Sequence, residues 1–278
     1  MYYLAVFALY AFVFAFGSII GSFLNVVVYR VPNGLSVAEG RSFCPRCHAK
    51  IRPYDLIPVL SWFILKGKCR DCGQPIAARY PLVEAAGGAL AVLCCAVYGF
   101  HLQALTAFAV AAVLLPLSLI DADTMTIPDG LLVALAVPAV ASYFVMPGPG
   151  LAARAIGFFA VSLPMLLLTL LIPDCFGGGD IKLAGATGLG LGLPARLTAS
   201  CLGLTGFVMY GCMVCLWNRF KGKRDKEAFP VGPFLAGGAA AVYCMRLGGC
   251  TWNTLAGNGK WRQRPGSGMA YKSSKCRA

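Results

Sequence analysis

Charged residues are scarce in this sequence. Asp, Glu, Lys and Arg make up 13% of its 278 residues, whereas 58% are hydrophobic and the mean hydropathy is +0.72. An average soluble protein carries about a quarter charged residues, so most of this chain must face lipid or other apolar helices. The scarcity excludes an ordinary soluble domain and predicts an all-α polytopic membrane protein.

Acidic residues are scarcer than basic ones. The chain has 11 Asp plus Glu against 24 Lys plus Arg, which gives a formal net charge of +13. In a soluble protein this excess would suggest a nucleic-acid partner. Here the basic residues stand in loops and in a C-terminal tail, where they set the orientation in a membrane. We therefore expect a lipid bilayer, and no nucleic acid, as a partner of this chain.

The N-terminus lacks the positively charged segment and the short apolar core of a cleaved signal peptide. Its apolar run extends from Tyr2 to about Val28, with no charge before Arg30, and predicts a first transmembrane helix at 1–29. About eight spans are expected in all. The further apolar runs lie at roughly 82–100, 103–120, 130–146, 152–172, 183–195, 199–217 and 231–248.

The last third of the first span carries small and polar residues. Gly17, Ser18, Gly21 and Ser22 allow another helix to approach closely. Asn25 is a polar group that needs a partner inside the protein. We expect this segment to be a helix-packing surface.

Positive charge is concentrated in the loop at 30–81, which contains nine Lys or Arg. By the positive-inside rule this loop is cytoplasmic and the N-terminus lies outside. Counting spans from there places 121–129, 177–182 and the basic loop at 219–226 on the cytoplasmic side as well. The expected parts are the helix at 1–29, the cytoplasmic loop domain at 30–81, a membrane-embedded core at 82–250 and a basic, disordered tail at 251–278.

Cysteine is plentiful, but no evenly spaced framework of secretory disulfides is visible among the 13 cysteines. Four of them form the pairs Cys44-x2-Cys47 and Cys69-x2-Cys72, with 21 residues between the pairs. Two such turns supply the four thiolates of a tetrahedral zinc site, which leaves no open position for water. We therefore predict a structural zinc ion that braces the loop. A redox pair is the alternative, which a reducing cytosol disfavours.

Two acidic loops separate the later apolar runs. The first is Asp121-Ala122-Asp123 with Pro128-Asp129 close behind, and the second is Gly177-Gly178-Gly179-Asp180, followed by Lys182. Three consecutive glycines remove side chains from the backbone, so a peptide can approach Asp180 closely. The alternative interpretation is that Asp180, like Asp123 or Asp129, only caps a helix.

Asp121 and Asp180 are the candidate catalytic pair. Two spans that leave the membrane and return separate them, so the fold can bring them to one surface. At a partly dehydrated site, repulsion would keep one carboxyl protonated and the other ionised. The ionised one could take a proton from water as the water attacks a peptide carbonyl that the protonated one polarises. Intramembrane carboxylates also serve ion carriers, and the residues alone leave both functions open.

The motifs together resemble those of the bifunctional type IV prepilin peptidases, a family of Gly-x-Gly-Asp aspartic peptidases. The resemblance covers about residues 15–240, and the tail after about residue 250 departs from it. Six ordered motifs carry it: Gly-Ser-Phe-Leu-Asn-Val-Val-Val-Tyr-Arg-Val-Pro at 21–32, the paired cysteine turns, Arg79-Tyr80-Pro81-Leu82-Val83-Glu84, Asp121-x-Asp123 with Pro128-Asp129, Gly-x-Gly-Asp at 177–180 with Lys182, and Phe229-Pro230-Val231-Gly232-Pro233-Phe234.

The resemblance implies that Asp121 and Asp180 cleave the basic leader of type IV prepilins and pseudopilins at the cytoplasmic face of the bacterial inner membrane. Because short members without the cysteine loop are thought to cleave only, it also implies N-methylation of the new N-terminal residue with S-adenosylmethionine. Supporting positions are implied for Gly177, Gly179, Asp123, Asp129 and Lys182. We expect Asp123 to tune the charge of Asp121, Lys182 to steady Asp180 or the local backbone, and Asp129 to cap a helix.

No glycine-rich fingerprint for the methyl donor is visible, so the sequence assigns no residue to methyl transfer. Two rival functions stand beside the peptidase. One is a zinc-stapled membrane carrier that uses the intramembrane aspartates for ion coupling. The other is a noncatalytic assembly factor of a pilus or secretion machine, which would tolerate Asp180→Asn.

Overall fold

The computed structural model describes residues 1–38, 40–146, 150–172, 176–221 and 230–245. These ranges hold helices and two isolated β-bridges but no extended strand. The tail predicted at 251–278 lies outside them. In chain order the elements are α1 (Tyr2–Arg30), η1 (Pro53–Leu56), α2 (Leu60–Ile64), α3 (Arg79–Tyr98), α4 (Leu102–Thr124), α5 (Asp129–Val145), α6 (Leu151–Leu171), α7 (Gly178–Leu191), α8 (Leu193–Lys221) and α9 (Gly232–Met245).

The predicted all-helical membrane architecture is confirmed. By length and composition α1, α3, α4 and α6 can each cross a membrane, and the apolar helices α5 and α9 are shorter. Each of the eight predicted apolar runs overlaps a helix of the structure. Four spans are supported in this way, and the full count of eight stays a prediction.

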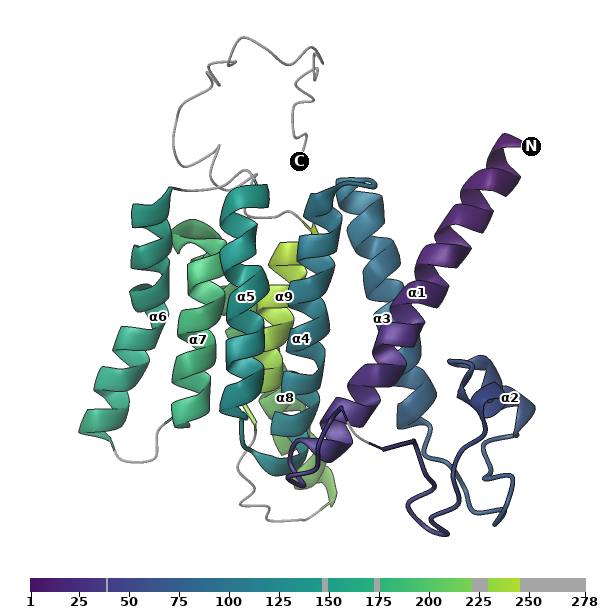
Figure 1. Ribbon diagram of the computed structural model, residues 1–278. Coiled ribbons are helices and arrows are strands. Elements are labelled where there is room, and N and C mark those ends of the chain that lie inside the picture. The colour runs from purple at the N-terminus through teal and green to yellow at the C-terminus, as the bar shows by residue number, and fades with distance from the viewer. Residues whose placement is uncertain (39, 147–149, 173–175, 222–229, 246–278) are drawn as a thin grey trace.

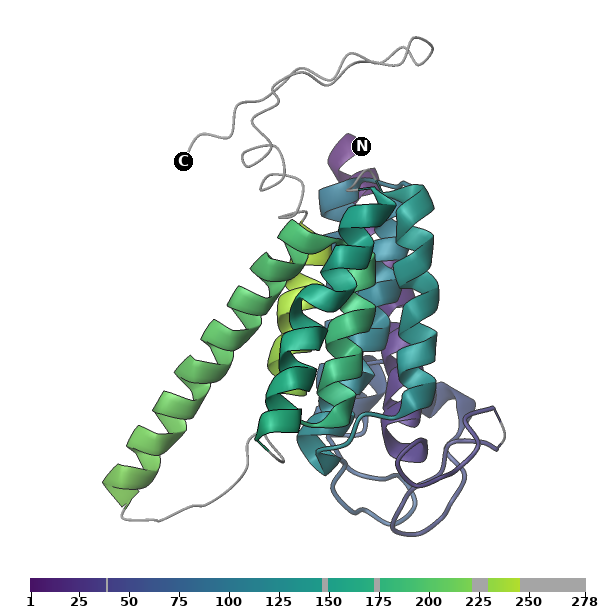
Figure 2. The ribbon, with the colours of Figure 1, turned by 90° about the vertical axis from the view of Figure 1, so that its left-hand side faces the viewer.

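The helix ends that carry the acidic motifs lie at one end of the bundle. In Figure 1 the C-terminal end of α4 and the N-terminal ends of α5, α7 and α9 point toward the end at which α2 lies. The N-terminus of α1 lies at the opposite end. Figure 2 shows that α8 leans away from the other helices toward its C-terminal end. The order of the helices thus brings both acidic loops and the cysteine loop to one side.

Small residues join α1 to α3, as the sequence predicts. A Cβ atom added to Gly17 would lie 2.5 Å from the carbonyl oxygen of Gly87, so the two helices pack backbone to backbone. Asn25 finds the internal partner that it needs, because its Nδ2 donates to the carbonyl oxygen of Tyr80 at 3.1 Å. This seam fixes the start of α3 against the end of α1.

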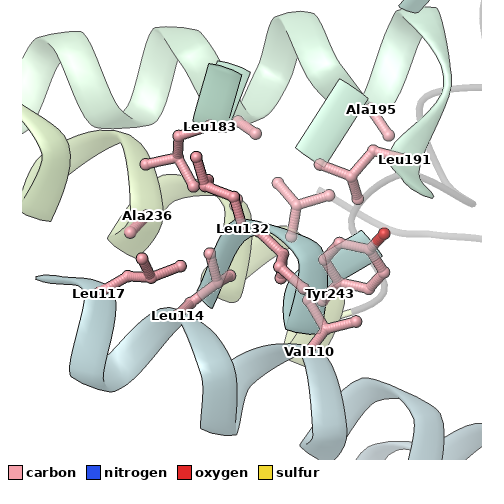
Figure 3. Close-up of a cluster of buried hydrophobic side chains, with 13 residues drawn as sticks. Val110, Leu114, Leu117, Leu132, Leu183, Leu191, Ala195, Ala236 and Tyr243 are labelled. Atoms are coloured by element: carbon pink, nitrogen blue, oxygen red, sulfur yellow. The ribbon is translucent and has the colours of Figure 1, made fainter. Parts of the chain in front are cut away.

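A buried hydrophobic cluster holds α4, α5, α7 and α9 together (Figure 3). Leu114 and Leu117 of α4 meet Leu132 of α5, Leu183 of α7 and Ala236 of α9. Each of these helices has an end at the acidic side of the bundle, so their packing sets the positions of the carboxylates. The core therefore lies directly behind the candidate site.

Candidate active site and metal centre

Asp121 lies in the last turn of α4. The helix ends at Thr124 because Met125 adopts the left-handed conformation with φ of 52°, while its N–H bonds to the carbonyl oxygen of Asp121 at 2.8 Å. The Asp121 residue is only 5% exposed. Its Oδ2 is buried and accepts no hydrogen bond within the described part of the protein. A buried carboxylate oxygen without a partner is costly, so this position is a candidate for a functional role.

Asp180 lies in the first turn of α7, which begins at the end of the bundle where α4 ends. Its Oδ1 is also buried without a hydrogen-bond partner among the described residues, and Asp121 is close enough for its charge to act on the Asp180 carboxyl. The acids that the sequence proposes as a pair therefore lie at the same end of the bundle, although 59 positions separate them. Their action as a catalytic pair stays a prediction. Two neighbouring carboxylates with unsatisfied oxygens can share a proton and receive a polar ligand.

The Gly-x-Gly-Asp spacing has a direct packing reason at one of its glycines, Gly179. A Cβ atom at Gly179 would lie 2.7 Å from the Cβ of Ile127, which belongs to the turn after α4. A Cβ atom at Gly177 would lie 3.4 Å from Oδ2 of Asp180, whereas Gly178 faces open space. Gly179 thus lets α7 approach the turn that follows Asp121, whereas a Cβ at Gly177 would make only an ordinary van der Waals contact with the Asp180 carboxylate.

Gly232 belongs to the site as well, although its motif was given no role from the sequence. It begins α9, and a Cβ atom added there would lie 2.5 Å from Oδ2 and 2.9 Å from Cγ of Asp121. The sequence feature that could have indicated this role is the segment Phe-Pro-Val-Gly-Pro-Phe, which contains no side chain typical of catalysis. The start of α9 is therefore a third wall of the site, formed by bare backbone.

The three supporting polar residues make contacts other than the expected ones. Asp123 was expected to tune Asp121, but it pairs with Arg79 at 2.5 Å. Lys182 was expected to steady Asp180 or the local backbone, and its Nζ lies 2.6 Å from Oδ1 of Asp129. The expected cap at Asp129 is wrong, because Pro128 occupies the N-cap position of α5 and Asp129 follows it in the first turn.

These two ion pairs tie helix ends together around the acids. The Arg79 pair links the start of α3 to the end of α4, and the Lys182 pair links α5 to α7. Both pairs are largely exposed to solvent, so each contributes at most about 1 kcal/mol to stability. Their effect is to hold the register of neighbouring helix ends rather than to stabilise the fold.

The four loop cysteines converge as the sequence predicts. One Sγ atom from each of Cys44, Cys47, Cys69 and Cys72 lies within 4.8 Å of the others, and the Cys44 and Cys72 sulfurs are 3.9 Å apart. Tetrahedral zinc with Zn–S bonds near 2.3 Å requires sulfur separations of about 3.8 Å. The donor set and its spacing therefore fit a metal ion with four thiolate ligands.

The two cysteine turns have the same backbone. Cys44 N–H bonds to Ala49 O at 3.0 Å, and Cys69 N–H bonds to Gln74 O at 2.8 Å. His48 and Gly73 take the same place in the two turns, each with a left-handed φ, of 57° and 67°. His48 is exposed, and it is not one of the four residues whose ligand atoms converge.

Backbone groups also favour the thiolate that a metal needs. The N–H groups of Cys47 and Arg46 lower the pKa of the Cys44 thiol to about 7. A thiol whose pKa is lowered in this way is easily deprotonated near neutral pH. Thiolate formation is the first requirement for metal coordination.

Two family models match the chain. The Bacterial Peptidase A24 N-terminal domain covers residues 15–98, and the Type IV leader peptidase family covers residues 108–217. The first contains the α1–α3 seam and the cysteine turns, and the second contains both acids of the pair. No solved structure matches the chain.

Curated relatives match most of the chain. A prepilin leader peptidase/N-methyltransferase of Burkholderia pseudomallei (strain 1026b) is 35% identical over 84% of this chain and 84% of its own length. A type 4 prepilin-like proteins leader peptide-processing enzyme of Escherichia coli O78:H11 is 34% identical over 83% of this chain and 92% of its own length. A prepilin leader peptidase/N-methyltransferase of Bacillus subtilis (strain 168) is 30% identical with the same coverage of 83% and 92%. The chain therefore belongs to the type IV leader peptidase family.

Proposed function

We propose that this chain is a membrane-bound aspartic endopeptidase that removes the leader from type IV prepilins and pseudopilins. The proposal is supported by two carboxylates with unsatisfied buried oxygens, Asp121 Oδ2 and Asp180 Oδ1, at one end of the bundle, where the charge of Asp121 acts on the Asp180 carboxyl. The printed names of the relatives above support the substrate class. An ion carrier is the weaker candidate, because none of these relatives is named as an ion carrier.

In the proposed mechanism the two acids act as one unit that holds a single proton. The ionised carboxylate accepts a proton from water as the water attacks the scissile carbonyl, while the protonated carboxyl donates a hydrogen bond to the carbonyl oxygen. When the tetrahedral intermediate collapses, the C–N bond breaks and a proton passes to the leaving amine. Gly178 faces open space, so an extended peptide can approach the backbone beside Asp180 there.

A prepilin offers a basic leader followed by an apolar helix. The proposed site cuts where such a helix leaves the membrane, since both acids lie at helix ends rather than within the apolar core. We assign this end of the bundle to the cytoplasm, because the basic loop at 30–81 lies on the same side and positive loops stay inside. The enzyme then belongs to the bacterial inner membrane and meets its substrate from the cytoplasmic side.

The second proposed activity is N-methylation of the new N-terminal residue. S-adenosylmethionine would supply an electrophilic methyl group when bound. The support is the printed name of two of the relatives, which includes N-methyltransferase, together with the cysteine loop of this chain. The role of the chain is to bind the donor beside the new amino group and to keep both oriented.

We propose zinc as the metal of the four cysteines and a structural role for it. Replacing Cys69 by serine is expected to reduce bound zinc from about one ion per chain to near zero, because four thiolates close the shell and three hold it poorly. The loop should then be cut rapidly by added protease. Metal analysis and limited proteolysis of the purified protein measure both effects.

His48→Gly is the matched control for this metal test. Because Gly73 already occupies the equivalent left-handed position, glycine at 48 is expected to keep the metal and the protease resistance. Full zinc content in Cys69→Ser would contradict the ligand assignment. Loss of zinc from His48→Gly would show that His48 is a ligand.

The whole function is tested with the purified chain in lipid vesicles and a full-length prepilin. Mass spectrometry is expected to show the leader and the mature protein as separate products, and a methylated N-terminus only when S-adenosylmethionine is present. An intact prepilin after prolonged incubation with folded enzyme would overturn the peptidase proposal. Ion flux that depends on Asp121 and Asp180, without cleavage, would favour the carrier.

A further inference from the structure

A cavity of about 400 Å³ lies apart from the acid pair, between the C-terminal part of α1, the cysteine loop and the start of α3. In Figure 1 these are the purple helix, the loop around α2 and the lower end of α3. Cavities of this size accommodate cofactors and small substrates. Neither the peptidase mechanism nor the metal site accounts for it.

The α1–α3 seam builds one wall of this cavity. Asn25 of α1 donates a hydrogen bond to the backbone carbonyl of Tyr80 at 3.1 Å. Gly21 allows α1 to approach Glu84 closely, since a Cβ added there would lie 2.9 Å from the Cα of Glu84. Asn25, Tyr80 and Glu84 all line the cavity. The packing of two helices therefore positions a phenol and a carboxylate at its edge.

Four guanidinium groups, of Arg30, Arg46, Arg52 and Arg70, line the cavity together with three carboxylates. Two of these carboxylates have an arginine partner within the lining. Asp55 receives two hydrogen bonds from Arg70, at 2.9 and 2.6 Å, and Asp71 lies 3.6 Å from Arg52. Glu84 forms no ion pair with the described residues. An uncompensated carboxylate in a cavity favours a ligand that carries positive charge.

Glu84 is also held in place by the loop. Its Oε2 accepts a hydrogen bond from the backbone N–H of Val59 at 2.7 Å. This bond joins α3 to the residue before α2, so the carboxylate is fixed by both walls of the cavity. A preorganised carboxylate binds a cation more strongly than a mobile one, because less conformational freedom is lost on binding.

Aromatic side chains supply the apolar part of the lining. Tyr29, Trp62 and Tyr80 come from α1, α2 and α3 respectively. Trp62 is held by a hydrogen bond from its Nε1 to Ile76 O at 3.1 Å and by close contact with Gly67, whose added Cβ would lie 2.9 Å from the ring. Flat aromatic surfaces bind purine rings by stacking and bind cations through their π faces.

The cavity also lies next to the acid pair along the chain. Tyr80 lines it, and the preceding residue Arg79 pairs with Asp123, two positions from Asp121. The Arg79–Asp123 pair therefore connects the start of α3, which borders the cavity, with the end of α4, which carries Asp121.

We propose that this cavity binds the methyl donor as a sulfonium-bearing nucleoside, with the Glu84 carboxylate as the partner of the sulfonium charge. This inference rests on the proposed second activity and gives it a location. The proposed zinc site adjoins this cavity, since Cys44 and Cys69 belong to the cavity lining. Adenosine fits the aromatic surface, and the positive sulfur fits the unpaired carboxylate.

The test compares two ligands that differ in the charge on sulfur. S-adenosylmethionine is cationic at sulfur, whereas S-adenosylhomocysteine is neutral there. Glu84→Gln keeps an oxygen that can accept from Val59 but removes the charge, so it is expected to weaken S-adenosylmethionine binding about tenfold or more and S-adenosylhomocysteine binding less than about threefold. Equilibrium dialysis with the full-length protein in lipid nanodiscs measures both.

Asp71→Asn is the matched control, because it removes a cavity carboxylate that Arg52 already compensates. The Asp71→Asn substitution is expected to change the binding affinities of the two ligands to the same extent. Equal loss of both ligands in Glu84→Gln, unchanged binding of both, or no binding of either ligand to the wild type would overturn the proposal. Leader cleavage measured on the same preparations separates this outcome from failure of the peptidase function, since Glu84→Gln is expected to cleave normally.

Discussion

Replacing Asp180 by asparagine is expected to reduce leader cleavage by about a thousandfold or more. Asparagine has nearly the same shape as aspartate, but it can neither accept a proton from water nor release one to the leaving amine. The helix should be preserved, because Asp180 stands in the first turn of α7 and its Oδ1 has no hydrogen-bond partner to lose among the described residues. Initial cleavage rates of a purified prepilin measure the loss.

Asp129→Asn is the control for this loss. Asp129 also begins a helix at the same end of the bundle, but its carboxylate is exposed and binds Lys182. Its replacement is expected to change the cleavage rate by no more than about threefold, because an exposed ion pair contributes little. An Asp180→Asn enzyme as active as Asp129→Asn would remove Asp180 from the mechanism.

Replacing Gly232 by alanine is expected to reduce cleavage by about a hundredfold, which is the cost of moving a reacting group by roughly 1 Å. The added Cβ would lie 2.5 Å from Oδ2 of Asp121, closer than real Cβ contacts, so either the carboxylate or the start of α9 must shift. The chain should still fold, because the change adds one methyl group at a helix end. The cleavage rate and the melting temperature in detergent report the two effects separately.

Gly237→Ala is the matched substitution in the same helix. A Cβ atom there meets nothing within 4 Å, so cleavage and melting temperature should both stay at the wild-type level. If Gly232→Ala cleaved as fast as Gly237→Ala, the start of α9 would not be a wall of the active site. If both variants melted early, α9 would be sensitive to any added side chain.

The arrangement of the helices could be predicted largely from the sequence. Apolar runs of membrane length and charged gaps between them are strong signals, because a lipid environment restricts the possible structures to helices or closed barrels. The contact of α1 with α3 was indicated by Gly17, Gly21 and Asn25, since small residues and a buried amide need a neighbouring helix. The position of Asp121 and Asp180 at the same end of the bundle followed from the direction of the spans between them.

The polar partners around the acids could not be predicted from the sequence. Lys182 pairs with Asp129 across 53 residues, and Arg79 pairs with Asp123 across 44 residues. Several acids and bases gather at the same end of the bundle, and their pairing depends on the rotation of each helix, which no local pattern records. Sequence proximity suggested Asp180 for Lys182, but the α5–α7 contact decided otherwise.

Gly232 and the cavity beside Glu84 were missed for a different reason. Gly232 matters because it has no side chain, so its role can be recognised only when the positions of the atoms around it are known. The cavity is made by α1, the cysteine loop and α3 together, and its carboxylate is distinguished only by the absence of an ion pair that its neighbours have. Both features are properties of three-dimensional packing rather than of a motif.

The central claim is that Asp121 and Asp180 act as one catalytic unit, and a double-mutant comparison tests it most directly. Single-turnover cleavage of one prepilin would be measured for the wild type, Asp121→Asn, Asp180→Asn and the double variant, each with confirmed zinc content and melting temperature. If the acids share one proton, the double variant is expected to be no slower than either single variant within about threefold, as for other catalytic groups that act together. Losses that multiply in the double variant, or a single variant that keeps most of the wild-type rate, would contradict the two-aspartate mechanism.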